Sequence, residues 1–176
     1  MGKLFSKFEK LIVIDHAGYQ HFELAQLDEA LKHYDLAVAN DPTQGTWLFN
    51  RGLCKSRLDK VNEAIDDFTA SLATNSDNKD QIYNCRFNRG ICYRRLGELD
   101  KSIEDFKKAI DTKGEKASAY NNLGLSHFEN EDFEDALLNY QKAIQHDPES
   151  AVHYNNRGLA YYHFDKLEEA EADFNV

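Results

Sequence analysis

Small and aromatic residues recur along the chain at a fixed spacing, separated by polar stretches. Each copy contains a glycine, a small residue stands twelve positions after it, and an aromatic residue follows four positions after that. Small residues let two helices approach closely, and the aromatic ring fills the space beside them. The pattern therefore predicts a series of helical hairpins. The glycines are Gly18, Gly52, Gly90, Gly124 and Gly158, the small residues are Ala30, Ala64, Ser102, Ala136 and Ala170, and the aromatics are Tyr34, Phe68, Phe106, Tyr140 and Phe174.

The chain's two prolines support the same reading. Pro42 and Pro148 occupy the same position of their copies, after the predicted second helix. Proline lacks a backbone N–H and ends a helix. Four extra residues near 79–82 lengthen one copy by about one helical turn. We expect the first helix of that copy to begin early, near Asp77 to Asp80.

This pattern resembles the tetratricopeptide repeat. The units span 11–44, 45–78, 83–116, 117–150 and an incomplete 151–176. His21 and Lys55 depart from the family, which prefers tyrosine there. The resemblance implies an all-α fold, a right-handed α-solenoid of antiparallel helical hairpins. Residues 1–10 are expected to be an N-terminal helical extension or a lipidation segment.

Composition narrows the functional classes. The net charge of −10 would repel nucleic acid. Cys54, Cys85 and Cys92 form no CxxC pair, so we expect neither a disulfide framework nor a zinc site. The sequence shows no nucleophile with a base, no phosphate-binding glycine loop and no metal-ligand spacing. We therefore expect a cytoplasmic protein that is not an enzyme and uses no cofactor or metal.

One pair of positions varies together among the units. An arginine directly before the unit glycine is matched by an aspartate directly before the unit aromatic. Where Leu123 replaces the arginine, Asn139 replaces the aspartate. A guanidinium and a carboxylate suit a bidentate contact in a partly buried place, so we predict a structural ion pair within each unit. The pairs are Arg51 with Asp67, Arg89 with Asp105, and Arg157 with Asp173.

A second set of positions is expected to bind a ligand. The resemblance implies that the first helices line a concave groove, where an asparagine recurs in four units. A row of asparagines could hydrogen-bond a peptide backbone; alternatively, these side chains cap turns or bond neighbouring helices. The predicted groove residues are the asparagines Asn50, Asn88, Asn122 and Asn156, the aromatics Tyr19, Phe22, Phe49, Phe87, Phe128 and Tyr162, and the arginines Arg57, Arg94 and Arg95.

Some of these aromatics are expected to belong to the core between units instead. The arginines would favour an acidic residue in the peptide, unless Asp59, Glu98 or Glu129 neutralises them. The family's carboxylate clamp for chaperone tails is disfavoured, because only the asparagine matches at its positions.

The N-terminus fits the N-myristoylation pattern at Gly2, with Ser6 following and lysines nearby. The alternative is that Leu4, Phe8, Leu11 and Ile12 extend the first helix as an apolar stripe. A membrane association is expected only if Gly2 is lipidated.

Two functions remain open. The first is a scaffold or adaptor that binds a peptide segment of a partner protein in the concave groove. The alternative is a structural building block of a larger cytoskeletal or ciliary assembly. In that case self-association would use an uncapped C-terminal edge, because repeat arrays need a polar cap. We expect the chain to be a fragment of a longer protein.

Overall fold

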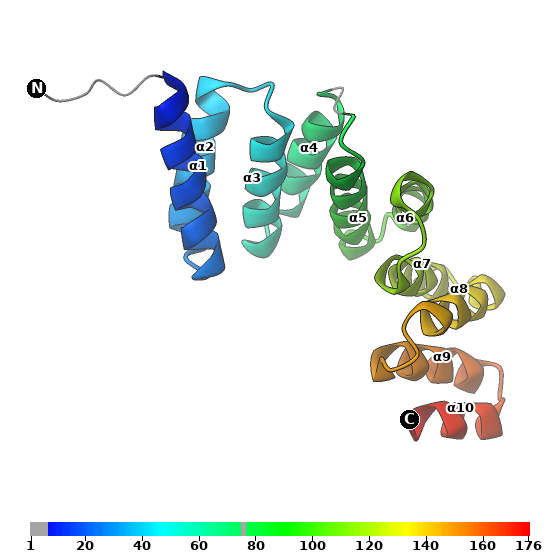
Figure 1. Cartoon of the computed structure of the whole chain (residues 1–176). Coiled ribbons are helices and arrows are strands. Elements are labelled where there is room, and N and C mark those ends of the chain that lie inside the picture. The colour runs from blue at the N-terminus through cyan, green and yellow to red at the C-terminus, as the bar shows by residue number, and fades with distance from the viewer. Residues whose placement is uncertain (1–6, 75–76) are drawn as a thin grey trace, which may run out of the picture. The chain divides into compact units, whose positions relative to one another are not determined.

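The computed structural model describes the backbone of residues 7–74 and 77–176 and the side chains of residues 13–74 and 77–176. All regular secondary structure in these residues is α-helical, as Figure 1 shows. The chain divides into two compact units, residues 1–92 and 93–176. Each unit is described by itself.

The first unit contains two helical hairpins and most of a fifth helix. α1 (Lys7–Glu23) pairs with α2 (Leu27–Asn40), and α3 (Gly45–Arg57) pairs with α4 (Val61–Leu72). α5 (Lys79–Arg95) begins inside the range expected from the extra residues. The Asn78 side chain caps it, because Asn78 Oδ1 accepts hydrogen bonds from the backbone N–H of Asp80 and Gln81 at 3.0 and 3.2 Å.

The second unit continues the alternation. α6 (Leu99–Lys113) packs against α7 (Ala117–Glu129), α7 pairs with α8 (Phe133–His146), and α9 (Ala151–His163) pairs with α10 (Leu167–Phe174). α2 and α8, the two helices that precede the prolines, end at Asn40 and His146. The residue before Pro42 is extended, with φ −150° and ψ 95°, as the proline ring requires.

In the α1–α2, α3–α4, α7–α8 and α9–α10 hairpins, the repeat glycine lies against its aromatic partner. A Cβ atom placed on Gly52 would lie 2.8 Å from the Phe68 ring, and one on Gly124 would lie 2.7 Å from the Tyr140 ring. Phe68 and Tyr140 are fully buried. The two helices therefore approach to a distance that only glycine allows, as the spacing predicted.

The turn inside each hairpin contains one residue with a left-handed backbone. These residues stand at the same position of each repeat, and only one of them is a glycine. They are Ala25, Asp59, Gly97, Glu131 and Asp165, with φ values of 56°, 63°, 73°, 63° and 57°. L-residues with a Cβ are strained in this region. The turn between the two helices therefore carries backbone strain at the same position wherever that residue is not glycine.

Candidate functional site

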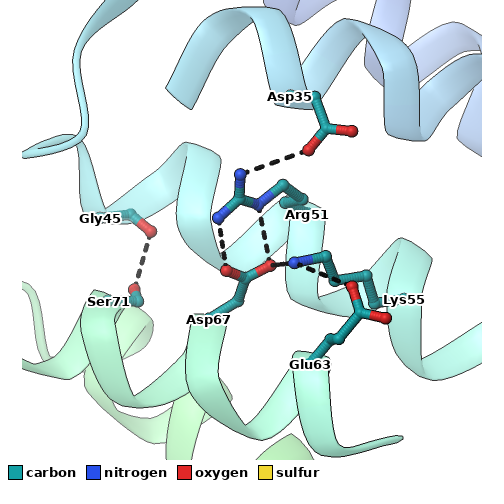
Figure 2. Close-up of polar contacts among 7 residues, drawn as sticks. All are labelled: Asp35, Gly45, Arg51, Lys55, Glu63, Asp67 and Ser71. Carbon is teal, nitrogen blue, oxygen red and sulfur yellow. Dashed lines mark hydrogen bonds and ion pairs between the residues drawn. The ribbon is translucent and has the colours of Figure 1, made fainter. Parts of the chain in front are cut away.

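In the first unit, the predicted arginine and aspartate side chains meet across the hairpin of α3 and α4. Arg51 Nε and Nη2 donate hydrogen bonds to the two carboxylate oxygens of Asp67 at 2.9 and 2.6 Å. Lys55 Nζ also lies 2.8 Å from Asp67, and Arg51 Nη1 reaches Asp35 on α2 at 3.3 Å. Figure 2 shows these contacts. Asp67 is buried, so the network neutralises a charge that burial alone would disfavour.

Lys55 was not assigned a role from sequence. It stands where the family prefers tyrosine, and that departure is the signal that could have indicated a second partner for Asp67. The contact with Asp67 ties the end of α3 to α4 and adds a weaker contact with Glu63 at 3.7 Å. This network is structural in character, since all its charges have partners within the protein.

The same contact recurs in the last hairpin. Arg157 Nε and Nη2 donate to the carboxylate oxygens of Asp173 at 2.8 and 2.7 Å. Arg89 lies on α5, where its Nη1 donates to Thr69 Oγ1 at 2.9 Å. Asp105 is a buried residue of α6. The pairing of Arg89 with Asp105 stays a prediction.

An apolar pocket lies between α1 and α3, and we call it the α1–α3 pocket. Its volume is about 200 Å³. Four of the predicted groove residues line it, together with Tyr34 from α2 and Leu53 from α3. Tyr34 is buried, its side chain is hydrogen-bonded to that of Asn50, and burial raises its pKa. The predicted residues in this pocket are Tyr19, Phe22, Phe49 and Asn50.

A second pocket in the other unit occupies the equivalent place between α7 and α9, and we call it the α7–α9 pocket. Its volume is about 240 Å³. It contains Phe128 and Asn156 from the predicted set, and Tyr140 takes the place of Tyr34. Five of its six lining residues stand at the same repeat positions as residues of the α1–α3 pocket. The matching pairs are Tyr19 and Leu125, Phe22 and Phe128, Tyr34 and Tyr140, Asn50 and Asn156, and Leu53 and Leu159.

The recurring asparagines are all half-buried, and their amide groups bond within the chain. Asn88 Nδ2 donates to the carbonyl of Asn84 at 2.8 Å and Asn122 Nδ2 to the carbonyl of Ser118 at 2.9 Å, each one helical turn earlier. Asn156 Nδ2 donates to Asn121 Oδ1 of the preceding first helix at 2.9 Å. These contacts favour the alternative in which the asparagines bond their own or neighbouring helices.

Several predicted aromatics pack against other rings. Phe49 tilts against Phe68, with ring centroids 5.8 Å apart, and belongs to the cluster around Ala64, Phe68 and Cys92. Phe87 stacks on Tyr83 at 5.8 Å. By contrast, Tyr19 and Tyr162 are 55% and 65% exposed. The exposed tyrosines are therefore more accessible to a ligand than the packed phenylalanines.

Phe128 has a mixed environment. It makes edge contacts with Phe133 and His163, at centroid distances of 5.3 and 6.3 Å, and it also lines the α7–α9 pocket. Its ring therefore serves the core between repeats and the wall of the pocket at once.

The predicted arginines differ in how their charge is used. Arg57 lies over the Phe22 ring at 4.0 Å, at the α1–α3 pocket. Arg94 Nη1 donates to Glu129 at 2.6 Å, so Glu129 neutralises that charge at the α7–α9 pocket. Arg95 is exposed.

The buried cysteines are poor nucleophiles. All three are free and buried, and burial raises the pKa of Cys54 to about 12 and that of Cys85 to about 11. Over residues 7–74 and 77–176, no three His, Cys, Asp or Glu side chains gather in a way that could hold a metal ion. In the same part of the chain, no helix is long and apolar enough to cross a membrane. Gly2 lies outside the described residues.

A third hollow was not foreseen from the sequence. It is lined by residues of α6, α7 and α8, and we call it the α6–α8 groove. Leu123 and Asn139, which replace the arginine and aspartate of the other hairpins, line it. That replacement was visible in the sequence, but a hollow follows from it only once the packing of three helices is known.

Comparisons with known proteins agree with the repeat pattern. Family models described as "Tetratricopeptide repeat" match residues 117–150 and 139–172, and one described as "TPR repeat" matches residues 90–131. The first of these ranges coincides with the fourth unit expected from sequence. No curated protein matches the chain.

Among solved structures, MamA from Desulfovibrio magneticus RS-1 has a TM-score of 0.86 at 17% identity, covering 94% of this chain and 92% of MamA. Another MamA crystal structure has a TM-score of 0.79 at 23% identity, covering 90% of each chain. YrrB, described as a TPR protein with an unusual peptide-binding site, has a TM-score of 0.73 at 20% identity, covering 91% of this chain and 80% of YrrB. This likeness shows the fold, an α-solenoid of helical hairpins.

Proposed function

Because the chain carries tetratricopeptide repeats, matched over residues 90–172, we propose that it is a non-catalytic adaptor that binds a peptide segment of a partner protein. The repeat fold is a protein-interaction scaffold. The ligand would lie along the first helices and insert apolar side chains into the α1–α3 and α7–α9 pockets.

One observation carries this proposal: the two pockets repeat the same design in separate units. Each has a buried tyrosine from a second helix, an aromatic wall residue and an asparagine at the next first helix. Peptide recognition uses apolar pockets for side chains and polar groups for the backbone. The volumes of about 200 and 240 Å³ are suited to single side chains rather than to a large cofactor.

The charges around the two pockets favour an acidic residue at one place in the bound peptide. Arg57 stands over Phe22, a wall residue of the α1–α3 pocket, and the structure records no carboxylate paired with it among the described residues. At the α7–α9 pocket, Glu129 already pairs with Arg94. An acidic residue of the ligand is therefore expected near the first pocket and not near the second.

The test compares two leucines of similar exposure. Leu159 lines the α7–α9 pocket and is 47% exposed, and Leu36 on α2 lies outside both pockets and is 54% exposed. Peptides selected from a displayed random library on the wild-type protein would be measured by fluorescence anisotropy. We expect Leu159→Glu to weaken binding at least tenfold, because a carboxylate would enter an apolar pocket. Leu36→Glu should bind as the wild type does, and equal affinities for both variants would contradict the proposal.

A second candidate function is self-association, and one observation favours it. Phe174 on α10 is 47% exposed, whereas its counterparts Tyr34, Phe68, Phe106 and Tyr140 are at most 1% exposed. A second copy could cover the Phe174 ring. Light scattering coupled to size exclusion across a concentration series would test this: an increasing mass that Phe174→Glu abolishes supports a building block, and a constant monomer mass excludes it.

A further inference from the structure

One surface of α10 is exposed, although the same surface of the earlier second helices is covered. Phe174 is 47% exposed and Leu167 is 55% exposed. Glu171 stands between them and is also exposed. These three residues follow one another by four and three positions, so they share one side of the helix. We call the surface that Leu167, Glu171 and Phe174 form the α10 face.

The first unit shows what covers the same face of α2. α3 packs against α2, and Cys54 of α3 lies in one buried cluster with Leu31 and Tyr34. Leu58, four residues after Cys54, packs against this cluster. The covering helix therefore brings a small residue and, one turn later, an aliphatic residue to the face that carries the aromatic ring.

The small residue recurs wherever such a face is covered by the next hairpin of the same unit. Cys92 lies in the cluster of Phe68, and Ala160 lies in the cluster of Tyr140. Cys54, Cys92 and Ala160 stand at the same position of their repeats, and all three are fully buried. A larger side chain at this position would hold the covering helix away from the aromatic ring.

The α10 face keeps the aromatic ring of this design and changes its aliphatic residue. Phe174 stands at the position of Tyr34, whereas Glu171 stands at the position of Leu31. In the other hairpins that position holds an aliphatic residue, which is buried or half-buried. Those residues are Leu31, Ile65, Ile103 and Leu137.

The charge of Glu171 has no partner within the part of the chain that the structure describes. α10 contains three glutamates and neither lysine nor arginine. Its remaining acid, Asp173, is already paired with Arg157. Lys166, just before α10, lies 5.8 and 5.9 Å from the centres of the Tyr161 and Phe164 rings. The unpaired charge on the α10 face is therefore negative.

The occupant of the α10 face must match both features. A small residue would let a helix approach Phe174 as α3 approaches Tyr34. An aliphatic residue at the position of Leu58 would remove water from the Glu171 carboxylate without replacing it. A lysine or arginine at that position would instead form an ion pair with Glu171.

The residues of this chain disfavour a second copy as the occupant. The α1 helix of a second copy would bring Gln20 to Phe174 and Leu24 to Glu171, because these residues stand at the positions of Cys54 and Leu58. The amide of Gln20 would lose its water against an aromatic ring. Two α10 faces in contact would bring like charges of Glu171 together.

We propose that the α10 face binds a helix of a partner protein, which presents a small residue to Phe174 and, four positions later, a lysine or arginine to Glu171. This interaction goes beyond the peptide binding proposed for the α1–α3 and α7–α9 pockets and does not rest on it. It uses another surface, and its ligand is a helix.

The probe is a peptide of residues 45–58, the chain's own covering helix, with Cys54→Ala and Leu58→Lys. A lactam staple on the opposite side of the peptide keeps it helical, because an isolated helix of this length is marginal. One control peptide carries Leu58→Glu in place of Leu58→Lys. Another keeps Leu58→Lys and carries Cys54→Gln. Fluorescence anisotropy measures the affinity of each labelled peptide for the whole chain.

We expect the Leu58→Lys peptide to bind the wild-type protein at least tenfold more tightly than the Leu58→Glu peptide. The Glu171→Lys variant should reverse this order. Glu169→Lys on the same helix is the matched control and should keep it, because Glu169 stands at the position of Glu63, which faces Lys55 of its own hairpin. The Cys54→Gln peptide should bind at least tenfold more weakly than the probe. Circular dichroism melting shows that each variant is folded.

Four results would overturn the proposal. Equal affinities of the Leu58→Lys and Leu58→Glu peptides for the wild type would remove the role of Glu171, and so would an order that Glu171→Lys leaves unchanged. A folded wild-type protein that binds none of the peptides would exclude the helix as ligand. A dimer in light scattering that Phe174→Glu abolishes, with no peptide bound, would make a second copy of this chain the occupant.

Discussion

Arg51 donates hydrogen bonds to both carboxylate oxygens of Asp67, and Asp67 Oδ2 also forms an ion pair with Lys55 Nζ at 2.8 Å. Losing Asp67 and losing Arg51 therefore have different consequences. Without Asp67, two cations lose their shared partner, whereas without Arg51, Asp67 keeps its other cation. The burial of Asp67 makes it the centre of the network, and the hydrogen bonds that Arg51 donates to Asp67 raise the pKa of the Arg51 guanidinium.

We therefore expect the two single substitutions to differ. Asp67→Asn leaves two cations without their shared carboxylate and should lower the free energy of unfolding by about 3 kcal/mol. Arg51→Leu leaves Asp67 with Lys55 and should cost about 1.5 kcal/mol, in the range of a hydrogen bond to a charged group. The double variant imitates Leu123 and Asn139 and should be less destabilised than Asp67→Asn alone. Urea unfolding followed by circular dichroism measures all three, and additive losses would contradict a coupled pair.

A substitution of Gly97 in the left-handed turn should lower the stability through backbone strain and not through side-chain packing. Gly97 has φ of 73°, and a Cβ there would meet nothing within 4 Å. Gly97→Ala should therefore cost about 1 kcal/mol through backbone strain alone. Conversely, Asp59→Gly at the equivalent turn should change the stability little or raise it. Thermal unfolding of both variants checks this, and a neutral Gly97→Ala would show that the turn relaxes.

A packing effect is expected at the contact between Gly124 and Tyr140. A Cβ at Gly124 would lie 2.7 Å from the ring, so α7 and α8 would have to separate. Gly124→Ala should cost about 2 kcal/mol as an overpacking substitution, despite alanine's better helix propensity. Combining it with Tyr140→Leu, which removes the ring atoms in contact, should recover part of this loss. The double variant would be compared with Tyr140→Leu alone, and an equal loss in both backgrounds would show that the ring is not the obstacle.

His153 on α9 predicts a pH dependence of stability. Burial lowers the pKa of His153 from its ordinary 6.5, against a smaller opposing effect of Asp147. The unfolded chain binds a proton at this histidine at a higher pH than the folded chain does. The free energy of unfolding should therefore fall as the pH is lowered through about 6.5 and stop falling, as regards His153, below the folded pKa.

Urea unfolding at pH 7.5, 6.5 and 5.5 would measure this dependence. His153→Gln should reduce the slope, because glutamine does not titrate. His16→Gln, at an exposed position of α1, is the control and should leave the slope as it is. A slope of the same size in His153→Gln would assign the pH dependence to other groups.

Much of the site could be predicted from the sequence, because the repeat brings equivalent residues together in every copy. The co-variation of Arg51 with Asp67, against Leu123 with Asn139, indicated which positions face each other across a hairpin. The resemblance to the tetratricopeptide repeat also placed Phe22, Phe49 and Asn50 in one groove, and these residues meet at the α1–α3 pocket. Whether these residues bind a peptide stays a prediction.

The sequence by itself determined the helical hairpins, their small and aromatic contacts and the ends of helices at prolines. These depend on residues one helical turn or one hairpin apart, and every copy repeats the same signal. The tertiary structure alone decided which polar groups pair across neighbouring hairpins, such as Arg94 with Glu129 and Asn156 with Asn121. Several partners compete for each such group, and the choice depends on distances that spacing along the chain does not specify. The α6–α8 groove has the same origin, because a shorter side chain leaves a hollow only where three helices already hold their positions.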